Sequence, residues 1–168
     1  FAVSSYGNQQ PMVSHEGSTV KEVYNPDIYC KGAMLMHTLR YVLGDSIFFP
    51  TLKRFITNVK YPYDQFFTSD DVEQFFIRET GKDLKPIFDF YCEAITEIGI
   101  DVYQYDPGTY YIAVSNPPAG SLPLDIVTDK GIIHTTMNAT RDKPFWFRSK
   151  TTPAIDPRGW YLRKVTFH

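Results

Sequence analysis

The sequence predicts an α+β fold in which a helical cluster is followed by a small antiparallel β-sandwich. Up to about residue 96, apolar residues recur every three or four positions, which is the spacing of one helix face. From Glu97 onward they alternate with polar residues, and turn sequences such as Asp106-Pro107-Gly108 separate the alternating stretches. We therefore expect a helical domain over residues 1–96 and an immunoglobulin-like β-sandwich over residues 97–168.

The composition is that of a globular protein with a large aromatic core. The chain has 168 residues, among them 13 Phe and 12 Tyr. Its formal net charge of −2 gives no basic excess, so we expect no nucleic-acid partner. No apolar run approaches the roughly 20 residues that cross a bilayer, so we expect no membrane span. The chain starts at Phe1 without a signal-peptide pattern, and we expect it to be a piece of a longer protein.

The first long helix has clear boundary signals. Asn25 can cap it, Pro26 suits its first position, and Asp27 places negative charge at the positive end of the helix dipole. Gly44 ends it. An apolar stripe runs along it, formed by Gly32, Leu35, Met36, Leu39, Val42 and Leu43. Tyr29 lies in its first turn, where a phenol on a rigid element can offer its hydroxyl to a cleft.

Three shorter helices are expected over residues 46–59, 68–81 and 84–94, with Asp45 and Asp83 as the caps of the first and last. Thr68 with Asp71 three residues later predicts a capping box for the middle one. Pro50 removes one hydrogen bond inside the first, so we expect that helix to start irregularly or late. Short loops between them favour a compact antiparallel cluster.

Four further stretches extend the pattern around Tyr29. The ordered set is Tyr29-Cys30-Lys31-Gly32-Ala33, Leu43-Gly44-Asp45, Phe48-Phe49, Thr68-Ser69-Asp70-Asp71-Val72 and Gly81-Lys82-Asp83-Leu84. In order and spacing, residues 24–95 resemble zinc aminopeptidases of the aminopeptidase N family. The β-rich remainder resembles them more loosely.

The resemblance implies a catalytic role for Tyr29. In that family the tyrosine before x-Lys-Gly is catalytic: its hydroxyl donates to the oxyanion formed on the scissile carbonyl, beside a zinc ion. Tyr24 lies five residues earlier and can reach the same cleft as a substrate-binding residue, although a packing role explains it equally well. Lys31 points to a different face of the helix, where it can pair with a carboxylate. We expect an apolar, exposed, concave surface around Tyr29.

The family's zinc ligands have no counterpart here. The family holds zinc through His-Glu-x-x-His and a downstream glutamate. His15-Glu16 matches only the first half of that motif, since Thr19 stands where the second histidine belongs. Cys30 and Cys92 are expected to be buried thiols rather than a disulfide or metal site.

The resemblance therefore places the cofactor and the partners in the full-length parent. We expect the zinc ligands upstream of Phe1, so that zinc belongs to the parent and this fragment holds no metal and is inactive alone. The expected partners are the parent's peptide substrate and the missing N-terminal metalloprotease half.

A rival hypothesis makes the chain a non-catalytic module that binds a protein or a carbohydrate. Its contact residues would be exposed aromatics of the β-rich half, namely Tyr103, Tyr105, Tyr110 and Trp160. The plainer interpretation of these residues is packing between sheets or domains.

Overall fold

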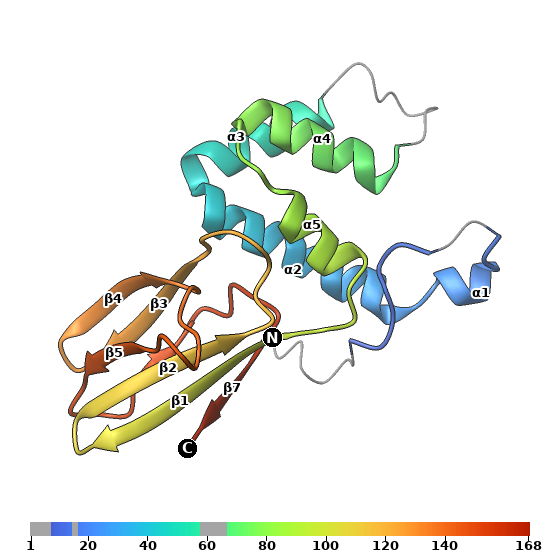
Figure 1. Cartoon of the computed structure of the whole chain (residues 1–168). Helices are drawn as coiled ribbons and strands as arrows, with labels where there is room; N and C mark the ends of the chain where they lie inside the picture. Colours follow the sequence, from blue (N-terminus) through green and yellow to red (C-terminus); the bar gives the residue numbers. More distant parts are fainter. Residues whose placement is uncertain (1–7, 15–16, 58–66) are drawn as a thin grey trace. The chain divides into compact units, whose positions relative to one another are not determined.

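Helices form the first part of the chain and strands form the rest (Figure 1). The computed structural model describes residues 8–14, 17–57 and 67–168. Two compact units divide the chain, Phe1–Ile95 and Thr96–His168. None of the described helices is long and apolar enough to cross a bilayer. The predicted α+β class, with the helices before the strands, is confirmed.

The expected long helix and three shorter helices are present in the first unit. The helices are α1 (Val20–Val23), α2 (Pro26–Leu43), α3 (Asp45–Ile56), α4 (Ser69–Thr80) and α5 (Lys85–Cys92). The short helix α1 was not predicted, because its four residues are too few to show a helical period. The end of the helix expected over residues 46–59 and the loop that follows it fall on residues 58–66, which lie outside the described residues.

The predicted start and end of α2 are both confirmed. The Asn25 side chain accepts a hydrogen bond from the Asp27 N–H at 2.9 Å, and Pro26 is the first helical residue. Gly44 has a φ of +76° and donates its N–H to the Arg40 carbonyl at 2.8 Å. A positive φ suits glycine, which has no Cβ to clash.

Helix α3 corrects two predictions. Asp45 is not its cap: Gly44 occupies that position, and the Asp45 carboxylate instead accepts hydrogen bonds from the Arg40 guanidinium at 2.7 and 3.0 Å. The helix also does not start late, since it runs through Pro50. Pro50 is exposed and lies inside the helix, where its missing N–H removes one intrahelical hydrogen bond without ending the helix.

The capping box of α4 is confirmed, but the predicted cap of α5 is wrong. Thr68 Oγ1 accepts from the Asp71 N–H at 3.2 Å, and Asp71 Oδ2 accepts from the Thr68 N–H at 2.9 Å. At α5 the cap position is Leu84, whose side chain makes no capping bond. Asp83 accepts from the Lys85 N–H at 3.3 Å.

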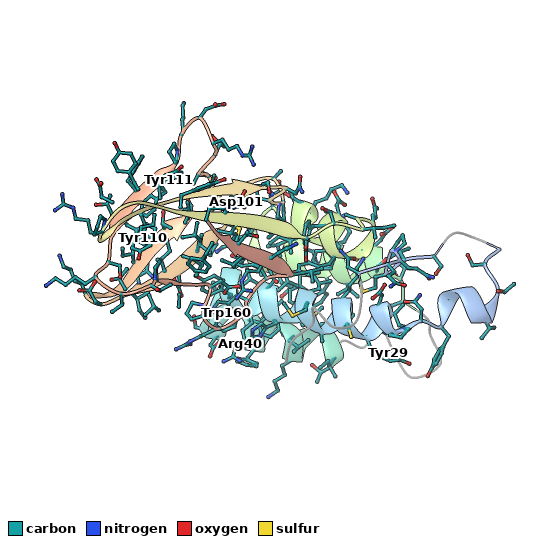
Figure 2. All side chains as sticks on the ribbon, turned by 90° about the horizontal axis from the view of Figure 1, so that it is seen from below. Tyr29, Arg40, Asp101, Tyr110, Tyr111 and Trp160 are labelled. Carbon is teal, nitrogen blue, oxygen red and sulfur yellow. The ribbon has the colours of Figure 1, made fainter. Side chains whose placement is uncertain are left out.

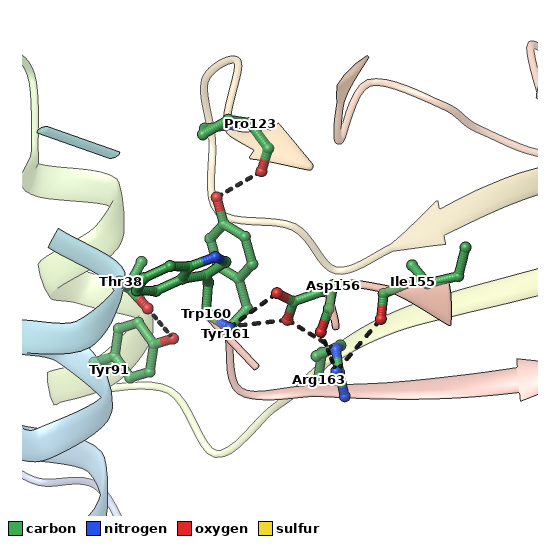
Figure 3. Close-up of polar contacts among 8 residues, drawn as sticks. All are labelled: Thr38, Tyr91, Pro123, Ile155, Asp156, Trp160, Tyr161 and Arg163. Atoms are coloured by element: carbon green, nitrogen blue, oxygen red, sulfur yellow. Dashed lines mark hydrogen bonds and ion pairs between the residues drawn. The ribbon is translucent and has the colours of Figure 1, made fainter. Parts of the chain in front are cut away.

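Aromatic rings and aliphatic side chains fill the helical core. The Phe55 and Phe75 rings meet edge-on at 5.2 Å between centroids. Thr38 Oγ1 and the Tyr91 hydroxyl lie 2.7 Å apart in a buried hydrogen bond that joins α2 to α5 (Figure 3). The buried face of α2 differs from the predicted stripe: Gly32, Met36 and Val42 are only half-buried, and their places are taken by Lys31, Met34 and Thr38.

Seven strands form two sheets in the second unit. They are β1 (Ile98–Asp106), β2 (Thr109–Ser115), β3 (Pro123–Thr128), β4 (Gly131–Thr136), β5 (Phe145–Arg148), β6 (Ala154–Ile155) and β7 (Arg163–Phe167). The sheets have the orders β5-β2-β1-β7 and β4-β3-β6. All pairs are antiparallel except β1 with β7, which run parallel from Ile98↔Arg163 to Val102↔Phe167. The sequence predicted antiparallel sheets, and the parallel pair β1–β7 is the exception to that prediction.

Alternating inward side chains build the core of this unit, and Ile98, Ile100 and Val102 of β1 are fully enclosed. Tyr110 and Trp160 are buried too, which contradicts their expected role as exposed contact residues.

The buried Asp156 organises the turn before β7: its carboxylate accepts from the Trp160 N–H at 2.9 Å and from Arg163 Nε at 2.9 Å (Figure 3).

Candidate functional site

Tyr29 stands on the exposed side of the first turn of α2. Its side chain is 59% exposed, whereas Asp27 and Lys31, two residues to either side, are 5% and 2% exposed. Positions two apart on a helix point to different faces, so burying Asp27 and Lys31 turns Tyr29 outward. Figure 2 shows Tyr29 at the N-terminal end of α2. Its hydroxyl is thus open to a molecule that approaches this turn.

The structure brings Tyr24 and Tyr29 together. Their rings meet edge-to-face, with centroids 6.0 Å apart and planes at 81°. A side-chain hydrogen bond with Tyr24 is the main cause that raises the pKa of Tyr29 above its ordinary value of 10.0. The Tyr29 phenol therefore keeps its proton at neutral pH and can act as a neutral hydrogen-bond donor.

Three apolar or aromatic side chains upstream of Tyr29, on α1 and just after it, are exposed. Val20 is 84% exposed, Val23 39% and Tyr24 69%. Apolar side chains at this exposure suit contact with another apolar surface. The expected concave shape of this surface stays a prediction.

The buried side of the same turn holds a strap, which we define as residues 9–13. The backbone N–H groups of Gln9 and Gln10 each donate a hydrogen bond to Asp27 Oδ2 at 2.9 Å. Lys31 Nζ donates to the Gln10 carbonyl and to the Ala94 carbonyl, each at 2.8 Å. The sequence suggested that Lys31 pairs with a carboxylate. In the structure its ammonium group instead binds two carbonyl oxygens. Burial lowers the pKa of Lys31, and the charge of Asp27 opposes that shift.

The strap also reaches the end of α5. The N–H groups of Met12 and Val13 donate to the Cys92 carbonyl at 2.8 and 3.0 Å. A Cβ added to Gly32 would lie 3.6 Å from Met12 Sδ, so the strap passes directly over this glycine. The first turns of α2, the strap and the end of α5 form one hydrogen-bonded assembly, which fixes the turn that carries Tyr29.

Sequence reasoning missed this assembly. Asp27 and Lys31 are spaced i, i+4, which was the visible signal, but that spacing suggests a surface ion pair. Residues 9–13 have no periodic pattern to indicate that they cross two helices.

The described residues do not fit a zinc site. They contain no group of three or more His, Cys, Asp or Glu side chains that could hold a metal ion. His15 lies outside the described residues. Cys92 is buried, and burial raises the pKa of its thiol to about 11, whereas Cys30 is only half-buried. A thiol that holds its proton this strongly is a poor metal ligand.

Comparison with known proteins settles the family. The family model described as "Peptidase family M1 domain" matches residues 2–91, more than half of the chain. The chain belongs to peptidase family M1. The match includes α2, Tyr29 and most of the strap's surroundings, and it confirms the resemblance to aminopeptidases of the aminopeptidase N type.

The fold of this chain is similar to part of a much longer protein of known structure. The crystal structure of Legionella pneumophila aminopeptidase A in complex with aspartic acid matches with a TM-score of 0.62 and 16% identity. The match covers 96% of this chain but only 21% of that one, so this chain spans about a fifth of the length of its structural relative. No curated protein matches the sequence.

Proposed function

We propose that this chain is part of a zinc-dependent aminopeptidase that removes N-terminal residues from peptides, and that it supplies the tyrosine which stabilises the transition state. Membership of peptidase family M1 supports the peptidase activity. The observation that carries the role of Tyr29 is its exposed, protonated phenol on a turn whose opposite side is held by Asp27 and Lys31.

In this proposal Tyr29 donates a hydrogen bond to the oxyanion that forms on the scissile carbonyl. A fixed donor aimed at developing charge contributes about 3–4 kcal/mol to a transition state. The hydrogen bonds of the strap hold the backbone of this turn, so only the side chain of Tyr29 has to be ordered when substrate binds. Tyr24 touches both Tyr29 and the bound peptide, and we place it as the substrate-binding residue.

Zinc belongs to the longer protein in this proposal. Because the described residues do not fit a zinc site, the ligands come from a metalloprotease half that is not in this chain. The 168-residue chain alone would then hold no stoichiometric zinc and hydrolyse no peptide. It would act only with the partner half, against whose surface the exposed residues around Tyr29 pack.

The test uses the longer gene product. We expect it to hydrolyse aminoacyl-7-amido-4-methylcoumarin substrates but not their N-acetylated forms, and to lose activity when 1,10-phenanthroline removes the metal. The 168-residue chain is the matched control and should be inactive in the same assay. A longer protein that cleaves N-acetylated and free substrates alike, or neither, would contradict the proposed aminopeptidase activity.

A further inference from the structure

An unbroken row of aromatic rings crosses the outer face of the β5-β2-β1-β7 sheet. Tyr103, Tyr111 and Trp146 are direct cross-strand neighbours on β1, β2 and β5, and His168 follows β7 beside Tyr103. The ring centroids are 4.5 Å apart for His168–Tyr103, 4.8 Å for Tyr103–Tyr111 and 4.7 Å for Tyr111–Trp146. Tyr105 meets Trp146 edge-on at 5.4 Å. These five residues are named the aromatic face.

The rings of this row stand against one another and turn their edges outward. The plane of Tyr103 lies only 11° from that of Tyr111 and 14° from that of His168, so both faces of Tyr103 are covered. Trp146 remains 48% exposed and Tyr105 67% exposed. The edge of an aromatic ring carries positive partial charge and attracts acceptor oxygens. Tyrosine hydroxyls add donors to the same surface.

Two cations on this sheet face are exposed and can bind an incoming carboxylate. Two carboxylates belong to the face: Asp101 already meets His168 Nε2 at 3.0 Å and Arg141 at 3.8 Å, and the exposed Asp106 is paired in register with Thr109. Arg148 and Lys164 are exposed, and within the described part of the chain neither forms an ion pair. Cross-strand register places Arg148 opposite Thr109 and Lys164 opposite Gly99, near opposite corners of the face.

We propose that the aromatic face binds a carboxylate-rich segment of another protein. Carboxylates of that segment pair with Arg148 and Lys164, and its carbonyl and carboxylate oxygens contact the ring edges and hydroxyls between them. Tyr, Trp and Arg are the residues that most often dominate binding at protein interfaces. This inference does not rest on the peptidase activity, because it concerns only the β-rich unit.

Other ligand classes fit the ring geometry less well. Bases of single-stranded nucleic acid stack on exposed aromatic faces, and sugar rings are held in a similar way. The faces of Tyr103 are already occupied, and Tyr111 is covered by Tyr103 and Trp146. The row offers edges and hydroxyls, which suit acceptor groups instead.

The two tryptophans give the 168-residue chain an internal control. Trp146 lies in the aromatic face, while Trp160 is only 8% exposed. The probe is a hexapeptide of alternating Glu and Phe, compared with its Lys–Phe counterpart, cellohexaose and a thymidine hexanucleotide. In ¹⁵N NMR spectra we expect the Glu–Phe peptide to shift the Trp146 indole N–H saturably and leave that of Trp160 in place. The Lys–Phe peptide should have little effect.

Three variants separate charge from rings. Arg148→Glu combined with Lys164→Glu should weaken binding of the Glu–Phe peptide about tenfold or more and reverse the preference toward the Lys–Phe peptide. Tyr103→Thr removes the central ring and should also weaken binding. Phe167→Thr is the matched control, since Phe167 is 50% exposed on the opposite side of β7 and should leave affinity unchanged.

Several results would overturn the proposal. Equal binding of the Glu–Phe and Lys–Phe peptides would remove the role of charge, as would a charge reversal without effect. A stronger Trp146 shift with cellohexaose or the hexanucleotide would assign the face to another ligand class. No saturable shift with any probe would show that the face does not bind such ligands.

Discussion

Each unit of the chain contains a buried carboxylate with a nearby cation, and the two are used differently. Asp27 in the helical unit is 5% exposed and Asp156 in the β-rich unit is 1% exposed. Both accept hydrogen bonds from two backbone N–H groups. Arg163 donates directly to Asp156, whereas Lys31 donates to two carbonyl oxygens beyond Asp27.

The sequence separations explain the difference. The donors to Asp27 are 17 and 18 residues away, and Lys31 reaches a carbonyl 63 residues along the chain. The donors to Asp156 lie four, five and seven residues away. The helical pair therefore joins distant segments beneath Tyr29, while the β pair shapes one local turn. Loss of the Asp27–Lys31 contacts should loosen the strap, the start of α2 and the end of α5 together. Loss of the Asp156–Arg163 contact should destabilise the β-rich unit through the turn before β7.

Removing Arg163 should have the largest effect. Arg163→Met leaves the Asp156 carboxylate buried without its counter-charge, and we expect a loss of about 3–5 kcal/mol in the free energy of unfolding. Urea unfolding followed by tryptophan fluorescence measures it. Arg141→Met is the control, because Arg141 is 82% exposed and its loss should cost at most about 1 kcal/mol. Equal effects of the two variants would contradict the importance of burial.

Removing the Asp27 carboxylate should have the next largest effect. Asp27→Ala leaves the N–H groups of Gln9 and Gln10 without an acceptor, which should cost about 2–3 kcal/mol. Hydrogen exchange should rise in the strap and in the first turn of α2 together. The exposed Asp70 provides the control variant Asp70→Ala, which should change neither. Faster exchange at α2 with unchanged exchange in the strap would show that Asp27 acts only locally, as Asp156 does, and would contradict the proposed difference between the two carboxylates.

The buried Cys92 thiol should make stability depend on alkaline pH. Its pKa is raised from 9.0 to about 11 by burial, so between these values the folded state binds more protons than the unfolded state. The free energy of unfolding that Cys92 contributes should therefore fall as pH rises from about 9 to about 11.

The pH effect is measured as the difference between wild type and Cys92→Ala in urea unfolding across that range. The difference matters because Lys31, whose pKa is lowered, acts with the opposite sign and raises stability until the unfolded lysine titrates near 10.5. A difference that does not change with pH would show that the thiol is not buried in solution.

The smallest effect concerns the exposed side of α2. Tyr24→Phe removes the hydroxyl that bonds to Tyr29, so the pKa of Tyr29 should fall toward 10.0. Titration of the Tyr29 ring signals by NMR measures this change. Tyr105→Phe, in the other unit, should leave the Tyr29 titration as it is. An unchanged pKa in Tyr24→Phe would show that the two hydroxyls do not meet in solution.

Local signals in the sequence predicted most of the fold, because they depend on neighbours only. The cap at Asn25 and the capping box at Thr68 and Asp71 follow from spacings of two and three residues. The catalytic role of Tyr29 was likewise predicted from a local pattern, and it stays a prediction. The role of Lys31 was missed because its partners, Gln10 and Ala94, are distant in sequence.

The aromatic face was predicted only in part, for the same physical reason. Of the aromatics expected to be exposed, Tyr105 is exposed, Tyr103 is half-buried, and Tyr110 and Trp160 are buried. Which alternate residues of a strand face solvent depends on strand register, and a shift of one residue exchanges the two faces. The pairing of β1 with β7, which brings His168 beside Tyr103, joins strands that are far apart in sequence.

The turnover number of Tyr29→Phe in the longer peptidase tests the central claim most directly. The account predicts a fall in kcat of about 100-fold or more, with zinc content and unfolding temperature unchanged, because only the donor to the oxyanion is lost. The control is Phe49→Leu, which alters an exposed ring on α3 and should keep kcat near that of the wild type. A Tyr29→Phe enzyme that turns over as fast as the wild type would contradict the account.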